Sequence, residues 1–205
     1  MKYIFFLLIT ASFSLPVFAG NFSLPELMQA LGQKKTLQAN FNETKIDSYL
    51  EIPISYSGQV EYKAPDYLKK VTRKPFLQSF ILDRNQVTIA IKQQPEKTYS
   101  MNEHPQLKAF AASYLSVLSG DLERLKKYYA ATIAGDEANW TITLKPLDSE
   151  ILKYIESMQF SGKQSNLIEV STWYQSGDES KMEFTGPKPP VDHNKKKLTS
   201  TKPGL

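Results

Sequence analysis

The chain has 205 residues, of which 41% are hydrophobic and 12% aromatic, enough for one core of ordinary size. It contains no cysteine, which excludes disulfides, thiol chemistry and cysteine-ligated metal sites. The formal charge of +4 is uneven: apart from Lys2, the segment 186–205 has five lysines against one aspartate, which leaves the rest near −1. A body without positive charge argues against a nucleic-acid-binding domain.

Residues 1–19 have the features of a cleaved secretory signal peptide. Lys2 supplies the positive start, residues 3–15 the apolar stretch, and residues 17–19 the small-residue pattern that signal peptidase reads. The apolar stretch is too short to span a bilayer stably. The pattern predicts Sec-type export, cleavage before Gly20 and a protein that is soluble in the periplasm. Because no cysteine follows the cleavage site, we expect no lipid anchor.

The next segment predicts an amphipathic helix followed by short strands. Ser23, Pro25 and Glu26 form a helix-start signature, and Gly32 ends the helix. Beyond it, runs of alternating polarity are separated by turn residues, which predicts an antiparallel meander. Gly58, inside one of these runs, marks a bend, a bulge or a close approach. The expected strands are 37–41, 54–62, 67–73, 79–83, 87–92 and 97–101.

Residues 106–119 change to the helical period, and a shorter helix follows at 122–127. Leu107, Phe110 and Tyr114 are spaced as on one helix face, and the opposite side is largely apolar as well. A helix that is apolar on most of its surface is expected to be buried. It is either an ordinary core helix or a plug that closes a concave sheet.

The remaining chain returns to strands. These are expected at 128–134, 139–145, 158–161, 166–173 and 180–185, with a short helix at 148–156. The total of about ten to eleven strands and three or four helices predicts an α+β fold, mainly antiparallel β.

No arrangement of residues predicts an enzyme or a cofactor site. There is no Gly-x-Ser-x-Gly elbow, and neither His104 nor His193 has an evident partner for acid–base chemistry. His and carboxylate spacing typical of a metal site, and a glycine-rich phosphate loop, are both absent from the sequence. We therefore expect a non-catalytic protein without a cofactor. Glu43 is the one carboxylate of interest, and its simplest interpretation is an exposed or hydrogen-bonded strand residue.

Several short motifs, in order, resemble the outer-membrane lipoprotein carrier family (LolA), closest to its divergent LolA-like branch. The similarity extends from Gly20 to about Gly186. The motifs are Phe41-x-Glu43-Thr44, Gly58-x-Val60-x-Tyr62-x-x-Pro65-Asp66-x-Leu68, Leu118-Ser119-Gly120-Asp121 and Trp140-x-x-x-Leu144-x-Pro146.

The resemblance implies a half-open, incomplete β-barrel with helices covering its concave face. It also implies a monomeric periplasmic carrier that binds the acyl chains of a lipoprotein or another acylated lipid. The carrier would receive this cargo from an inner-membrane exporter and pass it to an outer-membrane acceptor. One departure concerns the arginine that the family places before the motif's proline, since Ala64 stands there and the family's lid latch does not transfer.

The alternative is a non-catalytic periplasmic sensor or scaffold protein of the same fold, acting in glycolipid or envelope-lipid assembly. A sensor would normally carry a second domain, whereas a scaffold would fill the cavity with its own side chains. In either case we expect one domain over 20–185. The segment 186–205 is then a basic, disordered tail, which is either without a role or weakly attracted to anionic lipid headgroups.

Alternation along the strands and the helical period select the residues expected to face the acyl cavity. The strand residues are Phe41, Tyr56, Val60, Tyr62, Phe80, Leu82, Ile89, Ile91, Trp140, Ile142 and Leu144, and the helix contributes Leu107, Phe110, Tyr114 and Leu115.

Overall fold

The computed structural model describes residues 22–49 and 52–186. The predicted signal peptide and, apart from Gly186, the predicted basic tail lie outside the described residues. The described residues form these helices and strands: α1 (Leu24–Leu31), β1 (Thr36–Ile46), β2 (Ile54–Lys63), β3 (Tyr67–Lys74), β4 (Gln78–Asp83), β5 (Gln86–Ile91), β6 (Lys97–Ser100), α2 (Pro105–Ser119), α3 (Leu122–Tyr128), β7 (Tyr129–Gly135), β8 (Trp140–Pro146), α4 (Ser149–Leu152), β9 (Ile155–Lys163), β10 (Asn166–Tyr174) and β11 (Glu179–Thr185).

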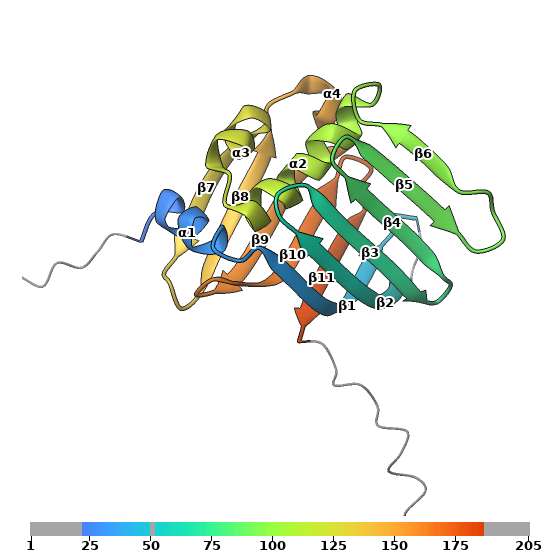
Figure 1. Cartoon of the computed structure of the whole chain (residues 1–205), viewed down its shortest axis with the longest axis horizontal. Helices are drawn as coiled ribbons and strands as arrows, with labels where there is room; N and C mark the ends of the chain where they lie inside the picture. The colour runs from blue at the N-terminus through green and yellow to red at the C-terminus, as the bar shows by residue number, and fades with distance from the viewer. Residues whose placement is uncertain (1–21, 50–51, 187–205) are drawn as a thin grey trace, which may run out of the picture.

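One antiparallel sheet contains all eleven described strands, in the order β6-β5-β4-β3-β2-β1-β11-β10-β9-β8-β7. Within the described chain, β6 and β7 are its two edges and do not pair with each other, so the sheet stays open. The halves of the sheet curve around α2, and α2 and α3 lie on the same face (Figure 1). The predicted α+β fold with a half-open sheet and helices on its concave face is confirmed.

The first helix and the long hairpin after it follow the sequence pattern. Leu27, Met28 and Leu31 are buried on one face of α1, and the Glu26 carboxylate accepts a 3.0 Å hydrogen bond from the Ser23 amide. At Gly58, the pairing of β2 with β3 shifts by one residue. A Cβ atom there would lie only 1.9 Å from the carbonyl oxygen of Val71, so a close approach requires glycine.

The helix predicted at 148–156 is wrong in its second half. Only residues 149–152 are helical, and Ile155 already begins β9. A register shift in the pairing of β9 with β10 leaves both Ile155 and Met158 buried. These two inward residues are three positions apart, and the bulge thereby imitates helical spacing.

Helix α2 is buried as its composition predicts. Ala109, Ala112, Leu115 and Val117 are each at most 1% exposed. The helix ends at Gly120, whose φ of 72° favours glycine. In the described structure the Ser116 hydroxyl is buried without a hydrogen-bond partner, so the packing of α2 leaves one polar group unsatisfied.

Several turns lie together at one end of the sheet, and we call them the rim: 47–53 (50 and 51 are not described), 75–77, 147–154 and 175–178. Pairing of Lys45 with both Ile54 and Ser180, and of Tyr174 with Ile155, places these turns at the same end. The opposite end carries the turn 64–66 and the start of β1. No helix in the described part of the chain has the length and apolar character to cross a membrane.

Candidate functional site

A cavity of about 270 Å³ lies between α2 and the concave face of the sheet, and most of its wall is apolar. Strands β1, β2, β3, β4, β10 and β11 supply one side of the wall. Phe110, Tyr114 and Leu118 of α2 supply the other. Among the lining residues, only Lys45 and Phe76 are exposed, and both lie at the rim end. The cavity therefore opens toward the rim.

Five of the residues predicted to face a cavity line this one: Tyr56, Val60, Phe80, Phe110 and Tyr114. Tyr56 and Phe76 meet edge to face with ring centroids 6.4 Å apart, beside the opening. The ring centroids of Phe110 and Tyr114 are 5.2 Å apart, and the Tyr114 ring also contacts the ring of Phe160. The five predicted residues therefore lie around one cavity, and four of them are aromatic.

The other ten predicted residues lie outside the cavity wall. Trp140, Ile142 and Leu144 belong to the large core cluster that includes residues of α1. Tyr62, Leu82 and Leu115 belong to a second core cluster, against which Ile89 packs. Phe41 is buried in a third cluster, and Ile91 and Leu107 are half-buried elsewhere. Alternation selects the inward face of each strand, but not the part of that face that helices cover. Core and cavity wall therefore have the same sequence pattern.

Sequence reasoning missed the polar part of the wall and several apolar members of it. The missed members that shape the site are Lys45, Lys70, Phe76, Leu118, Tyr174 and Ser180. For β1 a signal existed, because Leu37, Ala39, Glu43 and Lys45 have the same parity and share one face. Charged residues at inward positions were the sign that this face is not simply core.

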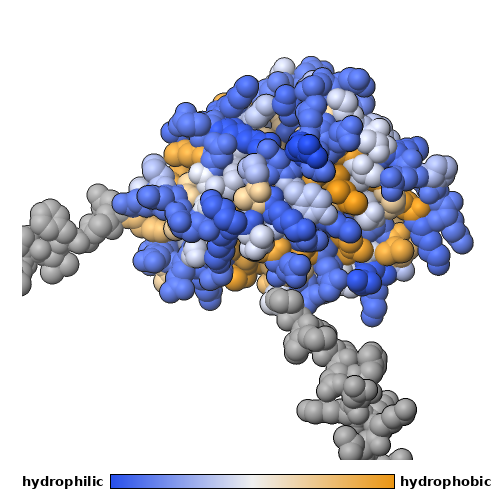
Figure 2. Space-filling view, viewed as in Figure 1, coloured by the Kyte–Doolittle hydropathy of each residue, from blue (hydrophilic) through white to orange (hydrophobic). Residues whose placement is uncertain are grey.

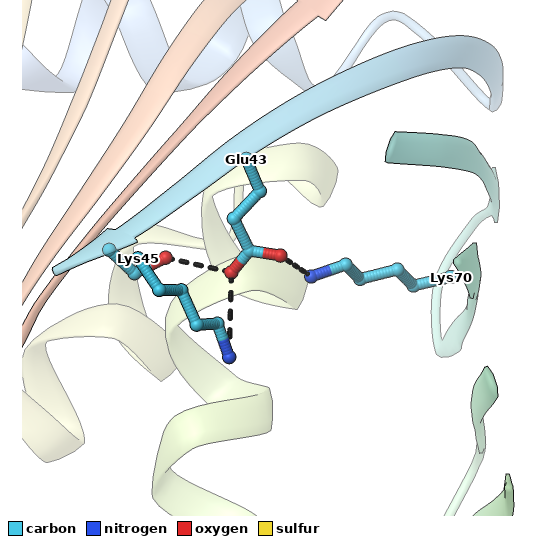
Figure 3. Close-up of polar contacts among 4 residues, drawn as sticks. Glu43, Lys45 and Lys70 are labelled. Carbon is cyan, nitrogen blue, oxygen red and sulfur yellow. Dashed lines mark hydrogen bonds and ion pairs between the residues drawn. The ribbon is translucent and has the colours of Figure 1, made fainter. Parts of the chain in front are cut away.

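Glu43 is the centre of a charged cluster inside the cavity (Figure 3). Its side chain is only 5% exposed and forms an ion pair with Lys70. The Ser180 hydroxyl donates a 2.7 Å hydrogen bond to Glu43 Oε1, and Lys45 Nζ lies 3.7 Å from the same oxygen. Lys70 Nζ is also 4.7 Å from the centre of the Phe41 ring. The carboxylate thus has partners at both oxygens.

These contacts set the ionisation of the cluster. Burial alone would raise the pKa of Glu43, but Lys70 and Lys45 outweigh it and hold the pKa below the usual 4.5. Burial lowers the pKa of Lys70, and Glu43 opposes that shift. Burial also raises the pKa of Tyr114, and Tyr174 and Glu43 act in the same direction. The contacts therefore favour the ionised form of Glu43, and burial favours the neutral phenol of Tyr114.

An ion pair joins the helices to the sheet at the end opposite the rim. Arg124 of α3 donates a 2.5 Å hydrogen bond to Asp66, in the turn between β2 and β3. Asp66 belongs to the motif in which Ala64 replaces the family's arginine. The motif therefore contacts a helix through an arginine, but this arginine is Arg124 of α3 and not a residue of the motif.

Comparison with known proteins gives one family and several distant structures. The family model for "outer membrane lipoprotein carrier protein LolA-like" matches residues 20–189. A LolA superfamily protein from Nitrosomonas europaea is 12% identical, with 82% of this chain and 95% of that chain covered and a TM-score of 0.41. The MucA/MucB complex of Pseudomonas aeruginosa includes a chain that is 9% identical, with 80% and 56% covered and a TM-score of 0.43.

None of the curated proteins matches the chain significantly. The structural likenesses are distant and concern the fold alone. The family match spans most of the sequence, including every described strand and helix. The chain therefore belongs to the LolA-like family of outer membrane lipoprotein carrier proteins.

Proposed function

We propose that this chain is a non-catalytic periplasmic carrier that binds acyl chains of a lipoprotein or related lipid and moves them from the inner to the outer membrane. The observation that carries the proposal is the apolar cavity between the sheet and α2. Residues 20–185 form the carrier domain in this proposal. An inner-membrane exporter supplies the cargo, and an outer-membrane acceptor receives it.

Release requires a second state of the protein. Burying a chain of about 16 carbons at roughly 0.8 kcal/mol per methylene stabilises the complex by about 12 kcal/mol, too much for spontaneous transfer. The cavity of about 270 Å³ is slightly smaller than most ligand sites, which span roughly 300–1,000 Å³. We infer that a long chain displaces α2, and that the return of α2 offsets part of the lost binding.

The packing of α2 fits such a movable element. Ser113 donates its hydroxyl to the carbonyl of Phe110 in its own helix, and within the described chain Ser116 has no partner. Ser116 therefore adds nothing to the contact with the sheet, although the Tyr129 hydroxyl of β7 donates a buried 3.0 Å hydrogen bond to the carbonyl of Ala109 in α2. Displacing α2 has to break that bond, and the unsatisfied Ser116 lowers the cost.

The scaffold alternative, a protein without lipid cargo, predicts a cavity filled by the protein's own side chains. The structure has open space lined by aromatic and aliphatic residues, which favours the carrier. Native mass spectrometry of residues 20–205, purified gently from a periplasmic extract, tests the choice. We expect a bound adduct that contains acyl chains. Bare protein that also fails to take up fatty-acid probes would contradict the carrier and support the scaffold.

We further propose that the rim contacts the membrane surface during loading and delivery. Apart from Ile168, every exposed large hydrophobic residue of the described chain is in the rim or at the strand ends beside it: Ile46, Tyr49, Ile52, Ile54, Phe76, Leu77, Leu147, Leu152 and Tyr154. Apolar side chains also interrupt the hydrophilic surface over β1–β5 (Figure 2).

A lipid bilayer is the partner that fits this surface best. Tyrosines with aliphatic neighbours on separate turns suit the membrane–water interface, where amphipathic rings are favoured. Phe76 belongs both to the rim and to the cavity wall. An acyl chain that leaves a bilayer beside Phe76 therefore enters the cavity without crossing open water.

Replacing Ile52 and Leu77 together by serine should weaken binding to phosphatidylcholine–phosphatidylglycerol vesicles by at least about tenfold, because two exposed apolar anchors are lost. Neither residue lines the cavity, so acyl binding in solution should persist. Ile168→Ser, an exposed position at the opposite end, is the control. Equal losses in both variants in a vesicle sedimentation assay would exclude the rim as the contact surface.

A further inference from the structure

We propose that the acyl ligand has an anionic group, a carboxylate or a phosphate, which binds beside Lys45 and Lys70 at the open end of the cavity. This inference rests on the proposed carrier function and names the class of its ligand. The charged residues of the cavity wall are Glu43, Lys45 and Lys70, and their net charge is +1. Figure 3 shows all three converging on one point.

The cavity is polar at one end and apolar at the other. Glu43 pairs with Tyr56 and Lys45 with Ser180, which places the charges toward the rim. The other end of the wall is formed by apolar residues: Leu37, Leu68, Leu118 and Phe184. A chain with its tail at that end has its head beside the lysines. This polarity matches a single acyl chain ending in a charged group.

The lysines have free bonding capacity, whereas the carboxylate does not. Glu43 already accepts from Lys70 and Ser180 and has Lys45 nearby. A lysine ammonium has three N–H donors, and within the described chain Lys70 donates to Glu43 alone. Lys45 Nζ is 3.7 Å from Glu43, beyond hydrogen-bond distance, and its side chain is 46% exposed. Lys45 can therefore turn to an incoming anion while Lys70 holds Glu43.

The test compares ligands that have the same chain and different heads. Hexadecanoate and hexadecanol displace an uncharged apolar dye from the cavity of the 20–205 chain, and a lysophosphatidate with the same chain gives the phosphate case. We expect the acid to bind about tenfold more tightly than the alcohol, ~1.4 kcal/mol, the size of one charge-assisted hydrogen bond. The tighter of the two anions identifies the source of the charge.

Variants assign this preference to the site. Lys45→Gln should remove most of the preference for the acid, so that hexadecanoate and hexadecanol bind this variant about equally. Lys69→Gln is the matched control, because Lys69 neighbours Lys70 on β3 but is not in the cavity wall. The control should keep the full preference, and so should Lys45→Arg.

The possible failures are distinct. Equal binding of acid and alcohol by the unsubstituted chain would overturn the anionic site and leave the acyl carrier standing. A preference that survives Lys45→Gln but falls in Lys69→Gln would place the anion elsewhere and also overturn the assignment. Absence of binding by the dye and by every acyl probe would overturn the carrier function itself.

Discussion

Glu43→Leu is expected to lower the free energy of unfolding by about 3 kcal/mol, because it leaves the ammonium group of Lys70 buried without its partner. Removing one member of a buried ion pair generally costs about 3–5 kcal/mol, and the lower end applies because Lys70 is 23% exposed. Chemical denaturation at neutral pH measures the change. The slope of the unfolding free energy against denaturant concentration should stay the same, because the surface exposed on unfolding is unaltered.

The double variant Glu43→Leu/Lys70→Leu is the control for this prediction. Two apolar residues of similar volume remove the unpaired charge, so most of the lost stability should return. A double variant as unstable as Glu43→Leu would mean that packing, rather than charge, caused the loss. If the double variant is stable but binds acyl anions poorly, the pair serves the ligand more than the fold.

The same pair predicts a pH dependence. The pKa of Glu43 is lower in the folded protein than the usual 4.5, so the unfolded chain binds the proton more readily. The stability from ionised Glu43 is therefore fully present above pH 4.5 and is lost as the pH falls through the folded-state pKa. Unfolding curves at several acidic pH values should show a shallower loss in the double variant than in the unsubstituted chain.

The sequence predicts the strands and the main helix because their periods are simple. Alternation along β2 and the i, i+3, i+4 spacing of α2 each reflect a single packed face. The error at 148–156 arose where a bulge brought Ile155 and Met158 to the same side, a backbone irregularity that composition does not encode.

The charged cluster required the three-dimensional pairing. Lys70 pairs with Val60, and Val60 pairs with Ala39, which lies four residues before Glu43 on β1. Backbone register alone therefore does not bring Lys70 and Glu43 together. Their contact depends on the long lysine side chain extending along the sheet past the Phe41 ring. The direction in which the Lys70 side chain extends is not encoded in the spacing or the polarity pattern of the sequence.

Leu115→Ala should increase the retention of an acyl ligand while lowering the free energy of unfolding by about 2–5 kcal/mol. Leu115, on α2, is fully buried within the second core cluster, where it packs α2 against the sheet. If a ligand displaces α2, the loss of this contact weakens the empty closed state more than the loaded one. Release to acceptor vesicles should then be slower by about tenfold or more, since ~1.4 kcal/mol of differential stability changes an equilibrium tenfold.

Leu144→Ala separates this effect from general destabilisation. Leu144 is equally buried but lies on β8, outside the cavity wall and the second cluster. It should lose a similar amount of stability and release its ligand at the unsubstituted rate. Equal retention in both variants would mean that α2 stays in place during binding and is only core. Slower release in Leu115→Ala alone would support the displacement of α2 when the ligand enters, because Leu115 is part of α2 whereas Leu144 is on β8.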